Sequence, residues 1–285
     1  MDATAKLHDI IKSAVPFVMA RRKETGGFGA TLRLPATIQD TYHALQILML
    51  ARQYAAQEME GYDPANDENL GSYLINCRLR LQVDARTRFQ MLRCSRFLGQ
   101  AMERNQVKDA VVTRLQTSRD PEEWYYHART LREVLDEDKP DAAAIKAPAE
   151  ITAGKWRTVR EAWMHLYLAD FLGCRLVLPE SELTDWFKAS QNSDGGFGFF
   201  PRTTSFVENC HAALRALAFL KAEPRNPALA FRFLAGCQTV SGGFSRASRA
   251  APFLDTTWHA LAALHILSLP ADENRGNDNE NPDPK

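Results

Sequence analysis

Apolar positions along the chain recur in helical runs that are separated by one repeated kind of turn. Three of these runs follow a Gly-Gly-Phe turn, a loop with a proline and an acidic residue. The Gly-Gly pairs at 26–27, 195–196 and 242–243 stand 14, 13 and 13 residues before their acid. Glycine adopts backbone angles that other residues resist, and an acid favours a helix start. Each copy therefore predicts a helical hairpin.

Three weaker copies fill the middle of the chain without the Gly-Gly turn. Two keep the start of the second helix, at 123–128 and 161–166, and the third, at 84–98, has Gln90 where the others have histidine. Six hairpins predict an all-α fold. We expect them to close into a ring, because both end copies are strong whereas the ends of an open solenoid are usually modified into caps.

The predicted domain organisation is one α/α toroid over residues 1–270 and a disordered tail over 271–285. The tail is rich in Asn, Asp, Glu and Pro and has no apolar anchor. The 285 residues are 45% hydrophobic and 25% charged, as in ordinary globular proteins. Thirty-five basic and 35 acidic residues cancel, so no net positive charge attracts nucleic acid or an anionic membrane.

Neither a membrane span nor a secretion signal is predicted. No stretch approaches about 18 apolar residues, and the basic residues at 21–23 follow the first apolar run instead of preceding it. The five cysteines are scattered and form no CxxC pair. We therefore expect a reduced, cytoplasmic protein.

The segment 191–198, Gln-Asn-Ser-Asp-Gly-Gly-Phe-Gly, is followed by Pro201, Glu208 and a helix rich in Ala and Leu. It resembles the repeat of the prenyltransferase and squalene-cyclase family, most closely the β subunits of protein prenyltransferases. The resemblance is strong over 180–270, clear over 20–55 and weak between. It implies an (α/α)6 toroid whose central cavity binds an isoprenoid diphosphate. In eukaryotic relatives a separate helical subunit is the partner.

The resemblance also implies a diphosphate and zinc site near residue 208. In the β subunits this region carries Arg, then Lys, Asp and Cys at set spacings; here Arg202, Ser205, Glu208 and Cys210 stand there. Glutamate thus replaces one zinc ligand and serine replaces the lysine. The third ligand, a histidine in the family, falls at Thr256. The resemblance proposes Arg202 for the diphosphate, and Arg249 is added because arginine recurs in the loops at 33, 202 and 249. The further candidates are Glu208, Cys210 and His259 for zinc, and Cys210, His211 and Asp255 for catalysis.

The alignment of the copies predicts that five of the seven histidines occupy the same position of the repeat, namely His43, His127, His165, His211 and His259. Each follows an acid by three or four residues, which places both on one helix face. They either pair with acids of neighbouring helices or form a polar lining for a ligand or metal. The aromatic residues beside them either line the cavity or pack in the core. The substrate-binding candidates are His43, His127, His165, His259, Trp258 and Tyr42, with Trp124, Tyr126 and Trp163 as further aromatic candidates.

Two classes of function remain open at this point. The first is a prenyl diphosphate-using transferase, with a terpene cyclase-like enzyme as a variant. For the variant, only Asp255 remains of the expected Asp-x-Asp-Asp run, and the chain is too short for a second barrel. The second is a non-catalytic toroid that binds a ligand or protein, which the eroded middle copies and the missing lysine and histidine favour.

Overall fold

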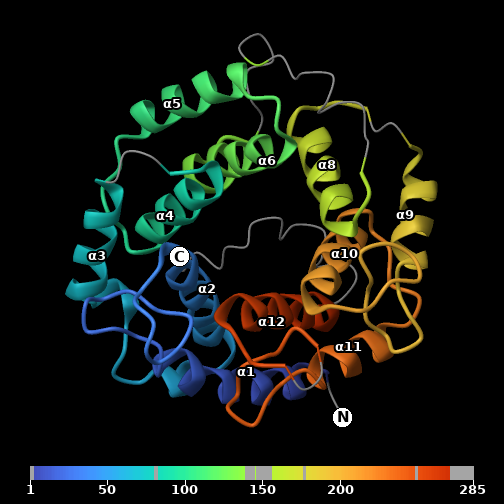
Figure 1. The fold of residues 1–285 in the computed structure, drawn as a ribbon, viewed down its shortest axis with the longest axis horizontal. Helices are drawn as coiled ribbons and strands as arrows, with labels where there is room; N and C mark the ends of the chain where they lie inside the picture. The colour runs from blue at the N-terminus through green and yellow to red at the C-terminus, as the bar shows by residue number, and fades with distance from the viewer. Residues whose placement is uncertain are drawn as a thin grey trace.

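The computed structural model describes residues 3–79, 83–138, 145, 156–175, 178–247 and 250–269, and within them it is helical, without β-strands. The elements alternate between an outer and an inner layer of one ring (Figure 1). The inner helices are α2 (Ile38–Tyr54), α4 (Ala85–Phe97), α6 (Pro121–Arg129), α8 (Val159–Phe171), α10 (Val207–Phe219) and α12 (Leu254–Ser268). The outer helices are α1 (Ala3–Met19), α3 (Glu68–Arg78), α5 (Arg104–Thr117), α9 (Glu180–Ala189) and α11 (Pro227–Ala235).

Shorter helical segments complete the description. Two 3-10 turns, Ala56–Met59 and Pro64–Asn66, connect α2 to α3, and a π-helical turn, Thr130–Val134, extends α6. Residues 139–155, which precede α8, lie almost wholly outside the described residues, as does the predicted tail at 271–285.

Side-chain caps fix where several inner helices begin. Thr37 accepts a hydrogen bond from the backbone N–H of Asp40, and Asp84 accepts one from that of Thr87. Thr158 and Glu161 form a reciprocal capping box at the start of α8. Such caps satisfy backbone groups that the helix leaves unpaired. The starts of α10 and α12 have no side-chain cap, although Glu208 and Asp255 stand in their first turns.

The Gly-Gly turns join neighbouring hairpins through close backbone contact. Gly195 and Gly242 have φ angles of +93° and +89°. A Cβ added to Gly195 would lie 2.2 Å from the carbonyl oxygen of Leu229 in α11, and one added to Gly242 would lie 1.9 Å from that of Ser13 in α1. Only glycine fits both the conformation and the space.

The ring closes between the last hairpin and the first. The Gly242 turn packs on α1, and the Gln238 side chain donates to the carbonyl oxygen of Ile10 at 3.0 Å. α12 packs against both α1 and α2, and the Tyr54 hydroxyl lies 2.9 Å from Nδ1 of His265. The predicted closed (α/α)6 toroid is therefore confirmed.

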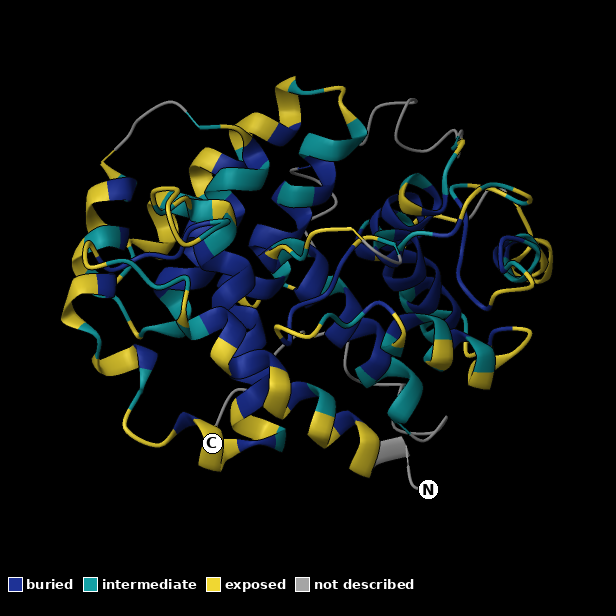
Figure 2. Ribbon diagram, turned by 60° about the horizontal axis from the view of Figure 1, so that its bottom comes forward, coloured by how far each residue is buried: buried dark blue, intermediate teal, exposed yellow. Residues whose placement is uncertain are grey.

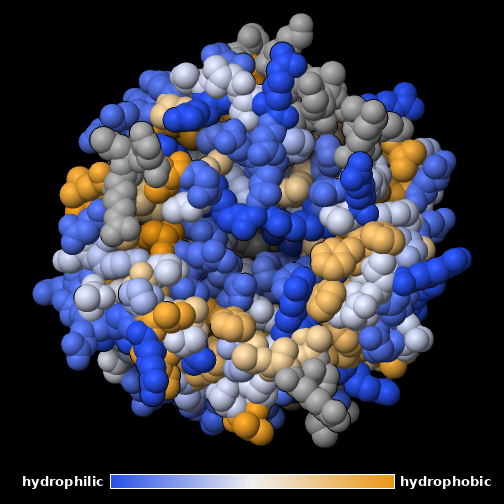
Figure 3. Space-filling model, in the orientation of Figure 1, coloured by the Kyte–Doolittle hydropathy of each residue, from blue (hydrophilic) through white to orange (hydrophobic). Residues whose placement is uncertain are grey.

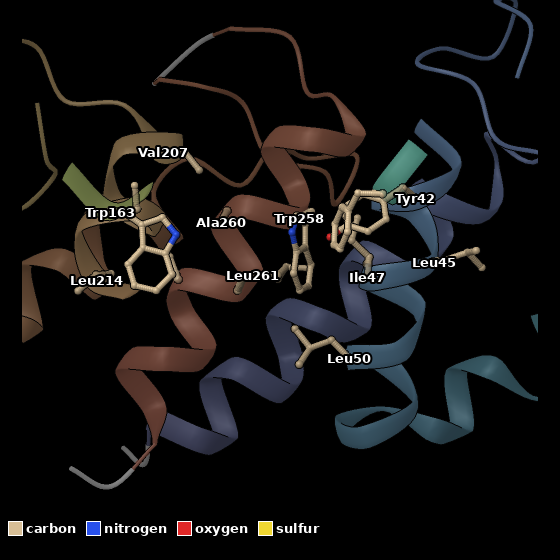
Figure 4. Close-up of a cluster of buried hydrophobic side chains, with 14 of the residues drawn as sticks. Tyr42, Leu45, Ile47, Leu50, Trp163, Val207, Leu214, Trp258, Ala260 and Leu261 are labelled. Carbon is tan, nitrogen blue, oxygen red and sulfur yellow. The ribbon is translucent and has the colours of Figure 1, made fainter. Parts of the chain in front are cut away.

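The hydrophobic core lies between the two layers. Buried residues concentrate on the inner helices, and the outer helices carry most of the exposed ones (Figure 2). Leu50 and Leu261 belong to the part of this core where α2 and α12 meet, whereas Leu45 points to the other side of α2 (Figure 4). The phenylalanines of the three Gly-Gly-Phe turns, Phe28, Phe197 and Phe244, are fully buried and anchor each turn.

Candidate functional site

A cavity of about 250 Å³ lies at the centre of the ring. Figure 3 shows a hollow with a hydrophilic rim at this place. Five of the six inner helices contribute side chains spaced i, i+3 and i+4, the spacing that places residues on one helix face. In α6 the lining residues are spaced i, i+1 and i+4. The lining residues are Gln39, Tyr42 and His43; Arg86, Phe89 and Gln90; Tyr125, Tyr126 and Arg129; Arg160, Trp163 and Met164; Glu208, His211, Ala212 and Arg215; and Asp255, Trp258 and His259.

An aromatic belt runs around this cavity at the middle position of the pattern. Five of the six inner helices place a large ring there, namely Tyr42, Phe89, Tyr125, Trp163 and Trp258, whereas α10 places His211. The rings touch edge to face: the centroids of Tyr42 and Phe89 are 5.9 Å apart, and those of His211 and Trp258 are 6.1 Å apart. The belt thus lines much of the cavity with apolar ring surface and π faces.

Two arginines stand at the mouth, in the first turns of α4 and α8. Arg86 and Arg160 both pair with Glu122 of α6, and the Arg160–Glu122 distance is 2.8 Å. Burial alone would raise the pKa of Glu122, but the two guanidinium groups outweigh burial and lower it. One carboxylate is thus shared by two guanidinium groups at this arc of the mouth.

A buried ion pair lies one helical turn below the belt. Arg129 makes a bidentate contact with Glu133, at 2.6 and 2.8 Å, across the π-helical turn. The guanidinium of Arg129 also stacks 4.3 Å from the ring centre of Phe89, and that of Arg215 stacks 4.6 Å from Trp163. Turns of π-helix often occur at functional sites. Here the turn holds Glu133 where it fixes Arg129 against the cavity.

The arc of the mouth formed by α10, α12 and α2 is acidic. Burial raises the pKa of Glu208, and the neighbouring Asp255 adds to this, although Arg246, at 3.0 Å, opposes it. Burial likewise raises the pKa of Asp40, which also faces Asp255. A second hollow of about 720 Å³ shares Gln39 and Asp255 with the central cavity and includes Asp40.

Three of the five predicted histidines meet in the cavity. Nδ1 of His211 lies 2.7 Å from Nδ1 of His259, a hydrogen-bond distance between neighbouring inner helices. The ring of His43 is 5.9 Å from that of His259. His127 and His165 are buried but are not among the lining residues. Burial lowers the pKa of His127 to about 4, and His165 lies beside the ring of Trp156.

The five histidines do not share one repeat position, and a recurring hydrogen bond shows why. The backbone N–H of Phe28, Phe197 and Phe244 donates to a side chain 13 residues later: Thr41 Oγ1, Cys210 Sγ and Thr257 Oγ1 respectively. Those three positions are equivalent. His43 and His259 therefore align with each other, whereas His211 aligns with Tyr42 and Trp258. In the first copy the Gly-Gly pair stands 14 residues before Asp40, against 13 residues before Glu208 and Asp255 in the other two. This difference indicates that Asp40 is displaced by one residue from the position of those acids.

The contacts of Cys210 do not fit the role of zinc ligand. Its thiol is fully buried and accepts the N–H of Phe197 at 3.3 Å, and burial raises its pKa well above that of an ordinary thiol. Glu208 pairs with Arg246, and His259 with His211. In the described part of the chain, no group of three or more His, Cys, Asp or Glu is arranged to hold a metal ion. We derive no step through zinc.

The remaining predicted residues divide between the cavity and its surroundings. Tyr42, Tyr126, Trp163 and Trp258 line the cavity, as do Glu208, Asp255 and His211. Trp124 is fully buried and donates from its indole N–H to the carbonyl oxygen of Ser118. Arg202 is exposed, with φ +72°, and does not line the cavity. Arg249 lies outside the described residues. The sequence analysis did not single out Arg86, Arg129, Arg160, Arg215, Phe89 or Tyr125.

The fold and the cavity define a class: a closed α/α toroid with an aromatic, arginine-bearing centre. The family model of the prenyltransferase alpha-alpha toroid domain matches residues 1–113 and 177–281, so the chain belongs to this family. The unmatched part, 114–176, holds two of the middle copies without a Gly-Gly turn. No curated protein matches the chain. No helix among the described residues is both long and apolar enough to cross a membrane.

Proposed function

We propose that this protein binds an isoprenoid diphosphate in the central cavity. The diphosphate lies at Arg86 and Arg160, and the isoprenoid chain lies on the aromatic belt below them. The observation that supports this most is the direct succession, from the mouth inwards, of two guanidinium groups and a belt of aromatic rings. A ligand with an anionic head and an unsaturated apolar tail matches that succession.

The mouth favours an anion for a second reason. The inner helices alternate with outer ones, so they run parallel and their N-termini gather at one end of the ring (Figure 1). Helix N-termini carry partial positive charge and free backbone N–H groups. Arg86 and Arg160 stand in such first turns and can bind phosphate oxygens bidentately. A bound diphosphate competes with Glu122 for them.

The belt suits the isoprenoid tail. Removing each methylene-sized group from water contributes about 0.8 kcal/mol. Aromatic faces also stabilise positive charge, which develops at the allylic carbon when its bond to diphosphate stretches. The belt therefore fits both a bound prenyl chain and the charge that forms during transfer, which supports an enzyme of the transferase class.

A non-catalytic toroid is the second candidate. The structural contact of Cys210 favours it, because that contact does not fit the thiolate–metal chemistry that the family resemblance implied. Under this alternative the same ligand binds, but no product forms. The cyclase-like variant has the support that Asp255 lines the cavity.

Calorimetric titration with geranyl, farnesyl and geranylgeranyl diphosphate tests the proposal. Inorganic diphosphate and farnesol, which represent each half of the ligand, should bind much more weakly than the joined molecule. Arg86→Met and Arg160→Met should each weaken binding about ten- to hundredfold, the effect of losing a charge-assisted hydrogen bond. Arg202→Met, exposed outside the cavity, is the matched control and should bind normally. If no prenyl diphosphate binds, or if only Arg202→Met weakens binding, the proposal fails.

A further inference from the structure

The hydrogen bond between two histidines of the cavity determines which of their ring nitrogens carry a proton. A hydrogen bond between Nδ1 of His211 and Nδ1 of His259, 2.7 Å apart, needs one proton between the two nitrogens. One ring therefore donates from Nδ1 and has its lone pair on Nε2, while the other accepts at Nδ1 and carries its proton on Nε2. Such a pair contains a base and can pass a proton from one ring to the other.

The position of the pair relative to the arginines is the second observation. Arg86 and Arg160 flank Glu122 on α6, and α12, which carries His259, lies across the ring from α6 (Figure 1). His259 thus lies across the cavity from Glu122, whereas His211 lies on α10, which packs against α8. His211 itself occupies the position of the aromatic belt on its helix.

Carboxyl groups stand beside the histidine pair on the same helices. Glu208 stands three residues before His211, and Asp255 four residues before His259, so each carboxyl group shares a helix face with its imidazole. A carboxylate beside an imidazole stabilises the imidazolium that forms on proton transfer. The other ionisable groups facing the pair are His43 of α2, at 5.9 Å from His259, and Arg215, one turn below His211.

We infer that His211 and His259 are the general base of this cavity. They take the proton of a protic nucleophile, of which water is the simplest, as it attacks C1 of the bound prenyl diphosphate. This inference rests on the proposed function. The nucleophile's oxygen forms a bond to C1, and the bond from C1 to the diphosphate oxygen breaks with its electron pair remaining on diphosphate. The water proton passes to the imidazole pair and then to the released diphosphate, leaving a prenyl alcohol.

This chemistry needs no metal ion. The second hollow shares Gln39 and Asp255 with the cavity and lies beside the acidic arc of the mouth. Positioned general bases contribute about 10²- to 10⁴-fold to a rate, which sets the size of the effect to be measured.

Farnesyl diphosphate is the probe, used with the full-length protein in excess EDTA. We expect farnesol and diphosphate in equal amounts. His211→Asn and His259→Asn should each lower kcat about a hundredfold or more with KM little changed, because the arginines that bind the anion remain. His127→Asn is the matched control: it removes a buried inner-helix histidine that does not line the cavity. Thermal melts confirm that each variant is folded.

The outcomes separate the two proposals. If farnesyl diphosphate binds but the wild-type protein releases no farnesol, or releases it only without EDTA, the inference is overturned while the binding proposal stands. Full kcat in both cavity variants also overturns it. If no prenyl diphosphate binds, the proposed function itself fails, and the inference fails with it. The wild-type measurements decide these points even if a histidine variant does not fold.

Discussion

Substituting Cys210 with valine or threonine tests whether its thiol is structural. Threonine occupies the equivalent position in the first and last repeats, where Thr41 and Thr257 accept the N–H of Phe28 and Phe244 at 3.0 and 2.9 Å. Valine has nearly the shape of threonine but no acceptor. The two variants therefore differ in one hydrogen bond, that of the buried N–H of Phe197.

The expected difference can be worked from this contact. An N–H buried without an acceptor costs about 1–3 kcal/mol. In a chain of this size each kcal/mol shifts Tm by about 2–4 °C, so Cys210→Val should melt about 2–12 °C below Cys210→Thr. Threonine can also donate to the carbonyl oxygen of Phe206, as Thr257 does to that of Phe253 at 2.7 Å. Cys210→Thr should therefore equal or exceed the wild type in stability.

Urea unfolding and thermal melts followed by circular dichroism measure the difference, and elemental analysis of the same samples measures zinc. Thr257→Val in the last repeat is the matched control and should lose a similar free energy. Equal stability of the valine and threonine variants would refute the structural role. Stoichiometric zinc in the wild type that is lost from Cys210→Thr would show instead that the thiol is a ligand.

Three further predictions follow from burial and backbone geometry. The pKa of His127 is about 4 in the folded chain and about 6.5 when unfolded, so between these pH values unfolding takes up a proton. The free energy of unfolding, measured with urea, should therefore fall by about 2 kcal/mol from pH 7 to pH 5. The fall should be smaller in His127→Gln. Gly242→Ala should lower the free energy of unfolding by more than about 2 kcal/mol, because the added Cβ is strained and collides with Ser13. Gly61→Ala, with φ +83° and open space around it, should lower it by about 1 kcal/mol. Equal losses in the two variants would contradict the packing of the Gly242 turn. A thiol reagent should modify the exposed Cys174 rapidly and the four buried cysteines slowly, and a Cys174→Ser variant that still reacts fast would be inconsistent with this.

The fold could be predicted because the repeat is specified locally. Glycine at 195 and 242 is required by positive φ and by backbone contact with the next hairpin, so the turns remain visible in the sequence. Caps such as Thr158 mark helix starts even in copies that have lost the turn. The weakest copy, predicted at 84–98, contains α4, Ala85–Phe97. Closure of the ring was predicted from the strength of the two end copies, and in the structure Gln238 makes one of the contacts with α1 that close it.

Which residues of each inner helix face the cavity was harder to predict, because the copies were aligned on a residue that does not occupy the same helix position in all of them. Aligning the copies on their acids placed five histidines together, but the acids occupy two helix positions: Glu208 and Asp255 align with Gln39, not with Asp40. The residue that fixes the register is the acceptor of the phenylalanine N–H. Threonine and cysteine both serve as this acceptor, and the sequence alone does not indicate that the two residue types occupy equivalent positions. A one-residue shift turns a side chain by about 100° on a helix, which is enough to move His127 and His165 out of the cavity.

The arginines could not be found in the sequence because their significance arises only from ring closure. A charged residue in the first turn of an amphipathic helix is normally exposed, and Arg86 and Arg160 are 36 and 38 residues from the glutamate they share. Taken around the ring, the outermost position of the pattern reads Gln39, Arg86, Glu122, Arg160, Glu208 and Asp255; all but Glu122 line the cavity, and Glu122 pairs with both arginines. The two basic and three acidic groups separate in space into a basic arc at α4–α8 and an acidic arc at α10–α12. A neutral composition therefore coexists with a mouth that can orient a ligand, with its anionic group towards α6 and its reacting carbon towards the histidine pair.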